Sequence, residues 1–122
     1  MKLKDGLYNK AVYLPKLNIP DRDIPLEYTY HAKEAALTDR FGIIILPESI
    51  NLKNCDIIEI EIKNSDIVKM VVRTSYNEDY DITLVISFTS GKVKTVWLNR
   101  KDDLHNTLNK SNYISEHEAY IK

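Results

Sequence analysis

Apolar and polar residues alternate through the second half of the chain, and this alternation predicts a β-sheet. Every second residue is apolar in four segments, which are 55–63, 67–75, 80–88 and 93–99. Successive side chains of a strand point to opposite faces, so each segment presents one apolar and one polar face. Short loops rich in Asn, Asp, Glu and Ser separate the segments, which favours antiparallel neighbours.

The loop lengths predict how the first three strands pair. Directly paired residues point to the same face, so three-residue loops fix the register. The predicted core pairs are Ile62 with Val68, Ile60 with Met70, Ile58 with Val72 and Val72 with Leu84. On the other face, this register places Glu61 opposite Lys69 and brings Glu59 diagonal to Arg73. Thr83 then lies opposite Arg73, so the polar face forms a coherent surface.

The register of the fourth strand has two alternatives. Ser90 and Gly91 form either a two-residue turn or part of a three-residue loop with a glycine bulge. The two differ by one residue and therefore exchange the faces of every side chain. We favour the bulge, which places Val96 and Leu98 in the core and puts Thr95, Trp97 and Asn99 on the polar face.

A helical pattern precedes the sheet. It runs from Thr29, a suitable N-cap residue, to Phe41, and Gly42 can end a helix in left-handed geometry. At about 100° per residue, Tyr30, Leu37 and Phe41 form one apolar stripe. We expect this stripe to pack on the apolar face of the sheet.

The N-terminal segment 1–28 is predicted to be an extended arm. Pro15, Pro20 and Pro25 are spaced five residues apart, and proline removes backbone donors and favours extended neighbours. Apolar residues between the prolines indicate that the arm lies across the domain or against a partner. That partner would be a host protein or a second copy of the chain, bound through residues 10–28.

Together these elements predict one α+β domain, with one helix packed on a four-stranded antiparallel sheet. The length of 122 residues fits a single core. The arm is 1–28, the helix and sheet are 29–99, and 100–122 is a polar tail of the same domain.

Composition narrows the function classes. The net charge of −1 supplies no overall basic field, so RNA binding would need a local patch. Cys55 is the only cysteine, which favours a buried thiol and a cytoplasmic location. No apolar run approaches the roughly 18 residues of a membrane span, and the charged N-terminus lacks the apolar core of a signal peptide. His31, His105 and His117 lie too far apart for a metal motif, and glycine-rich phosphate loops are absent, so we expect neither metal nor cofactor.

The polar face suggests an RNA-cleaving site. Attack by a 2′-hydroxyl needs a base, a cation for the phosphate and an acid for the leaving oxygen. Glu61 or Glu59 could be the base, Arg73 the clamp and His105 the acid. Substrate would contact Lys69, Thr83, Thr95 and Trp97. The alternative is structural, because a Glu and a Lys that face each other across two strands are most often a solvated pair.

The layout of one helix and a four-stranded meander over 29–99 resembles the RelE and barnase class of small ribonucleases. That resemblance implies catalysis on the exposed sheet face without a metal, with Glu61, Arg73 and His105 matching a base, a phosphate-binding arginine and an acid. Residues 93–99, with Asp103, His105 and Thr107, look like small accessory proteins of tailed bacteriophages, which implies a host cytoplasm. The competing hypothesis is a non-catalytic protein that binds a host protein or itself through its arm and sheet.

Overall fold

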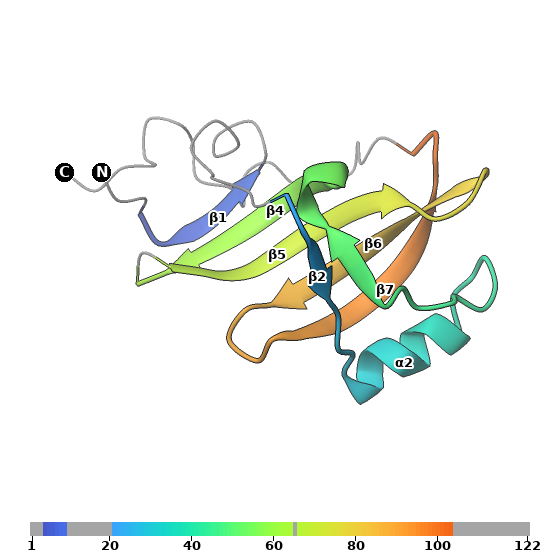
Figure 1. Ribbon diagram of the computed structural model, residues 1–122, viewed down its shortest axis with the longest axis horizontal. Coiled ribbons are helices and arrows are strands. Elements are labelled where there is room, and N and C mark those ends of the chain that lie inside the picture. Colours follow the sequence, from blue (N-terminus) through green and yellow to red (C-terminus); the bar gives the residue numbers. More distant parts are fainter. Residues whose placement is uncertain (1–3, 10–20, 65, 104–122) are drawn as a thin grey trace.

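A computed structural model describes residues 4–9, 21–64 and 66–103 (Figure 1). Its main sheet is antiparallel, in the order β1-β4-β5-β6-β7. The strands are β1 (Gly6–Asn9), β4 (Asp56–Lys63), β5 (Asp66–Ser75), β6 (Tyr80–Ser87) and β7 (Lys92–Arg100). The predicted α+β class is confirmed, but the described sheet has five strands instead of four. Part of the predicted arm forms β1, which pairs with β4.

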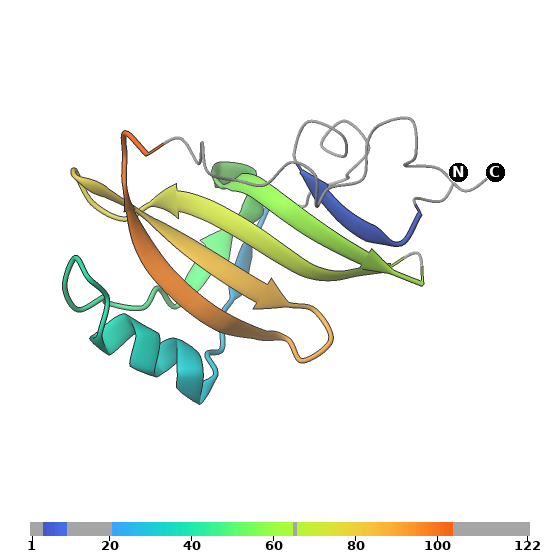
Figure 2. The ribbon, with the colours of Figure 1, turned by 180° about the vertical axis from the view of Figure 1, so that it is seen from behind.

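A second, two-stranded sheet crosses one face of the main sheet, and a helix lies along β7 (Figures 1 and 2). The helix is α2 (Tyr30–Leu37), and the small sheet consists of the antiparallel strands β2 (Asp23–Pro25) and β3 (Ser49–Asn51). The short 3-10 helix η2 (Leu52–Asn54) then leads into β4. The core lies between these layers and includes the fully buried Tyr8, Ile60, Val72, Leu84 and Val93. No helix among the described residues has the length and apolar character to cross a membrane.

The ends of α2 agree only in part with the prediction. Thr29 is the N-cap, because its hydroxyl accepts a hydrogen bond from the backbone N–H of Ala32 at 3.1 Å. The helix ends at Leu37, not at Phe41, because Thr38 leaves helical geometry. Gly42 does have a positive φ of 115°, but it lies in the loop beyond the helix.

The predicted packing stripe of α2 is wrong. Tyr30 is 77% exposed and Leu37 is 64% exposed, whereas Ala32 and Ala36 are buried. The helix therefore contacts β7 through its alanine side, where small side chains allow a close approach. Phe41 is half-buried beyond the helix and packs against another ring, with its centroid 4.9 Å from that of Tyr80.

Two irregularities in the pairing of β4 with β5 change the predicted register. Glu61 pairs with Lys69 as expected, but register shifts lie between Ile57 and Glu59 and between Glu61 and Ile62. The observed core pairs are Ile57 with Val72, Ile60 with Met70 and Ile62 with Ile67. A bulge inserts a residue into one strand, so Ile57 replaces Ile58 in the core.

The remaining registers agree with the prediction. Arg73 pairs with Thr83, and Thr83 pairs with Trp97. Val96 and Leu98 are buried, which confirms the favoured faces of the last strand. The position of the bulge differs from the prediction, however. The extra residue does not lie at Gly91 but beyond the turn, where the pairing of β6 and β7 shifts between Val85 and Ile86.

The outer edge of β7 is covered by the chain around α2. The backbone N–H of Val93 donates to the carbonyl of Glu27 at 2.8 Å, and the N–H of Thr29 donates to the carbonyl of Val93 at 3.0 Å. Further along, the Asp39 carboxylate accepts from the N–H of Leu98 at 3.2 Å. These bonds occupy backbone N–H and C=O groups of β7 that could otherwise pair with another strand.

The close contact between α2 and β7 gives the first prediction. Ala32→Leu should lower the free energy of unfolding by about 1 to 3 kcal/mol, because the larger side chain overfills a site with no exposed surface. His31→Leu, at an exposed neighbouring position, should change it by less than about 0.5 kcal/mol. Urea unfolding followed by circular dichroism measures both, and equal stability of the two variants would refute this packing.

Candidate functional site

The predicted site residues that the structure describes lie on the sheet face away from β2 and β3, and Figure 2 views the sheet from this side. Within the described residues this face brings together Glu61 of β4, Lys69 and Arg73 of β5, Thr83 of β6, and Thr95 and Trp97 of β7. His105, the predicted acid, lies outside the described residues. The sheet thus gathers one carboxylate, two cations and two hydroxyl side chains as the register argument expected.

Arg73 is buried and bonds to protein groups through every nitrogen of its guanidinium. Its Nε donates to Asp81 Oδ2 at 2.8 Å. Its Nη1 donates to the carbonyl of Asp103 at 2.6 Å, and its Nη2 donates to the carbonyl of Arg100 at 2.8 Å. The side chain is only 7% exposed. Arg73 therefore fastens the end of β7 to the middle of the sheet, and a phosphate would compete with all three acceptors.

Asp81 extends this network to the surface. Lys101 Nζ donates to Asp81 Oδ1 and to Ser75 Oγ, both at 2.9 Å. Burial alone would raise the pKa of Asp81, but the hydrogen bonds and charges of Lys101 and Arg73 outweigh burial and hold that pKa below 3.8. The carboxylate is therefore charged at neutral pH and contributes to the fold.

A second polar pair lies beside the arginine. The Thr83 hydroxyl, which has no exposed surface, donates to Asn99 Oδ1 at 2.6 Å. The Asn99 amide nitrogen in turn donates to the Asp103 carboxylate at 3.4 Å. The sequence placed Thr83 and Asn99 on this face but gave no sign that they are buried. The face is a packed hydrogen-bonded layer at this end, and substrate has no access to the Thr83 hydroxyl.

The other end of the face is more open. Glu61, Thr95 and Trp97 are half-buried. Lys69 Nζ forms its ion pair with Glu59 at 3.3 Å, although Glu61 is directly opposite in the register. A half-exposed pair of this kind contributes about 0 to 1 kcal/mol to stability. Solvent therefore still reaches the predicted catalytic Glu61 and the predicted binding residues Lys69, Thr95 and Trp97.

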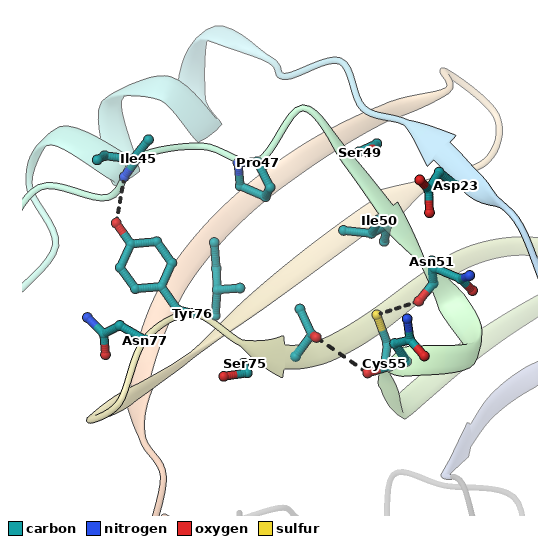
Figure 3. A pocket seen from close by; sticks show the side chains of 13 residues that line it. Asp23, Ile45, Pro47, Ser49, Ile50, Asn51, Cys55, Ser75, Tyr76 and Asn77 are labelled. Atoms are coloured by element: carbon teal, nitrogen blue, oxygen red, sulfur yellow. Dashed lines mark hydrogen bonds between the residues drawn. The ribbon is translucent and has the colours of Figure 1, made fainter.

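A groove on the opposite side of the sheet was not predicted. It has a volume of about 690 Å³ and lies between the two-stranded β2–β3 sheet and the ends of β5 and β6 (Figure 3). Its apolar lining consists of Ile45, Pro47, Ile50 and Ile82. Its polar lining consists of Asp23, Ser49, Asn51, Asn54, Cys55, Thr74, Ser75, Tyr76 and Asn77. The lining contains one carboxylate and no Lys, Arg or His.

Hydrogen bonds fix the walls of this groove. The backbone N–H of Ile45 donates to the hydroxyl of Tyr76 at 2.9 Å, as Figure 3 shows. The Thr74 hydroxyl donates to the carbonyl of Asn54 at 3.4 Å. Burial raises the pKa of the Cys55 thiol, so this sulfur stays protonated at neutral pH and is a poor nucleophile. The groove is therefore pre-formed and is equipped for binding more than for covalent chemistry.

Sequence reasoning missed the groove because its parts are far apart in the chain. Asp23 precedes the helix, Ile45 and Pro47 follow it, and Tyr76 lies beyond two strands of the sheet. The only available signal was the apolar character of the arm near Ile24, which indicated that this segment packs on the domain.

No group of three or more potential metal ligands occurs among the described residues. A comparison with protein-family models, curated proteins and solved structures gave no match to this chain. The functional argument therefore depends on the geometry alone.

The lowered pKa of Asp81 predicts acid-sensitive stability. The ordinary value is 3.8 and the folded value is lower, so the stabilisation is present above pH 3.8 and is lost as the pH falls through the folded pKa. Asp81→Asn should lower the free energy of unfolding by about 1 kcal/mol at neutral pH and remove this part of its pH dependence. Urea unfolding at neutral and acidic pH tests this, with Glu78→Gln, an exposed carboxylate in the adjacent turn, as the control. An unchanged pH dependence in Asp81→Asn would contradict the assignment.

Proposed function

We propose that this protein is a non-catalytic binding protein whose groove takes an extended peptide segment of a partner protein. The observation that carries the proposal is the groove itself, whose lining combines apolar side chains with hydrogen-bonding groups of which only Asp23 is charged. Apolar pockets bind alternate side chains of an extended peptide, while hydroxyl and amide groups satisfy its backbone. Both the predicted arm, through Asp23, and the sheet, through Thr74 and Ser75, contribute to this surface.

The charges of the groove favour a particular kind of partner. Asp23 is the only charged residue in the lining, so a strongly acidic segment would meet no compensating cation. A neutral or basic segment with apolar side chains fits better.

The fixed walls of the groove also reduce the entropy lost on binding, because the hydrogen bond between Tyr76 and Ile45 already orders the wall.

Two features support binding over catalysis. Arg73, the natural phosphate ligand of a ribonuclease on this sheet, is occupied by Asp81 and two carbonyls. The Cys55 thiol is the group of the groove lining best suited to nucleophilic attack, but burial raises its pKa and keeps it protonated at neutral pH. Neither group is poised to act on a substrate without rearrangement of the fold around it.

Selection from a displayed library of random peptides tests the groove. Enriched peptides should bind the wild-type protein and lose about tenfold or more in affinity for Ser49→Arg, because the long side chain enters the groove from its rim. Ser90→Arg is the matched control, since Ser90 is also an exposed serine but lies in the β6–β7 turn outside the groove. Isothermal titration with the selected peptides measures both. Failure to enrich any peptide, or equal affinity for both variants, would exclude the proposal.

The ribonuclease hypothesis remains a second proposal because Glu61 and Lys69 are opposite each other on an accessible part of the sheet, with half-buried Trp97 on the same face. If it holds, total RNA should be cut in the presence of EDTA to products with 2′,3′-cyclic phosphate ends. Glu61→Ala should then lower the rate by about 10²-fold or more, as should His105→Ala. Glu78→Ala, an exposed carboxylate in the β5–β6 turn, is the control. Absence of cleavage by the wild type would reject this hypothesis.

A further inference from the structure

Strand β3 has one edge that no described strand covers. The small sheet consists of β2 and β3 alone, so β3 is paired along one edge. In Figure 3, Asp23 of β2 lies on one side of β3, and Tyr76 of the opposite groove wall lies on the other. Ser49, Ile50 and Asn51 of β3 line the groove. The unpaired edge of β3 is therefore a wall of the groove.

The antiparallel pairing determines which backbone groups of β3 point to this edge. The N–H of Leu26 donates to the carbonyl of Glu48 at 2.9 Å, and these two residues continue the register of the small sheet. Hydrogen-bonded and non-hydrogen-bonded pairs alternate along two antiparallel strands. Ile24 and Ile50, two positions along, therefore form another hydrogen-bonded pair. Ser49 lies between them and directs its N–H and C=O away from β2, towards the groove.

These groups have no partner in the part of the chain that the structure describes. No described residue bonds to the N–H or the C=O of Ser49. Asn51 points the same way, and its carbonyl accepts a hydrogen bond from the Cys55 thiol at 3.4 Å. Other edges are protected, since Pro25 on the outer edge of β2 has no N–H and the chain around α2 bonds to β7. An open strand edge is a template for a further strand.

We propose that the peptide in the groove binds as a β-strand, which pairs with the open edge of β3 and extends the small sheet to three strands. This inference rests on the proposed function and states which part of the partner is recognised. The N–H and C=O of Ser49 bond to the main chain of one partner residue. Main-chain bonds of this kind supply affinity, and pockets for alternate side chains supply specificity.

The geometry of an added strand predicts the sequence that fits best. Directly paired residues point to the same face of a sheet. Ser49 is exposed and Ile50 is buried, so the partner residue opposite Ser49 faces solvent. Its two neighbours point to the other face, where Ile50 and Ile82 belong to the apolar lining. The preferred segment is therefore extended, with one polar residue between two apolar residues.

Exchange of single backbone amides for esters in a selected peptide tests the strand pairing. Each exchange removes one N–H and keeps every side chain. The ester at the residue opposite Ser49 should lower affinity by about threefold to tenfold, because the Ser49 carbonyl loses its donor. Esters at the two adjacent residues, whose N–H groups point away from β3, should change it by less than about twofold. Isothermal titration measures the series, and equal effects at all positions would overturn the proposal.

A change on the protein side tests the same bonds. Ser49→Pro removes the N–H that faces the groove but no hydrogen bond to β2, and proline is tolerated at such an edge. It should lower peptide affinity by about tenfold. Ser49→Ala keeps the N–H and is the matched control, with an expected change of less than about twofold. Thermal unfolding followed by circular dichroism shows whether each variant folds, and equal affinities of the two variants would contradict the pairing.

Amide hydrogen exchange of the full-length wild type needs no variant. The Ser49 amide should exchange about tenfold or more slowly once the peptide is bound, because its N–H becomes hydrogen-bonded. The Ile50 amide, which already pairs with Ile24, should be protected before the peptide is added. Protection of Ser49 in the free protein would show that this chain itself covers the edge, and would overturn the proposal.

The outcomes separate this inference from the proposed function. Peptides that bind and lose affinity for Ser49→Arg, yet show no dependence on the position of the ester, would reject the added strand and keep the groove as a peptide site. Failure to enrich any peptide would reject both.

Discussion

A sheet with one apolar face must be covered, and the way this chain covers it determines its other surfaces. The cover consists of one short helix and a small two-stranded sheet, which together bury the isoleucines and valines of the main sheet. These two small elements leave a groove where β2 and β3 meet the ends of β5 and β6. They also leave Tyr30 and Leu37 on the outer side of α2 exposed. The groove and the exposed side of α2 are both consequences of one constraint.

The second face of the sheet is stabilised in a different way. Its strands are joined by polar groups, with Arg73 of β5 contacting Asp81 of β6 and the carbonyls that follow β7. A charged side chain that is this deeply buried must have partners, because an unpaired charge there would cost several kcal/mol. The arrangement explains how an arginine can lie on a strand face without serving a ligand. Its acceptors supply the compensation that solvent cannot.

The sequence predicted the sheet more successfully than its cover. Alternation of apolar residues depends only on the strand repeat, so the faces of β5 and β6 could be read directly. The last strand left two registers open, and the one favoured for Thr95 and Trp97 agrees with the structure. The bulge of β4 could not be predicted, because Ile57 and Ile58 are both suited to the core and only three-dimensional packing chooses between them. The packing side of the helix was predicted wrongly for a related reason. Large apolar residues are assumed to face inward, but here the buried residues of α2 are the small Ala32 and Ala36.

The arrangement of the candidate site could also be predicted only in part. The pairs Glu61–Lys69 and Thr83–Arg73 were predictable from the register. The hydrogen bond of Arg73 to the Asp103 carbonyl was not, because it depends on where the chain turns after the last strand. The groove depends on long-range contacts that no local pattern encodes. One segment nevertheless joins the helix to the groove, because the N–H of Ile44 donates to the carbonyl of Ala36 in α2 and the N–H of Ile45 donates to the hydroxyl of Tyr76 in the groove wall. The shape of this wall therefore depends on the packing of α2 against β7, which only the folded chain brings about.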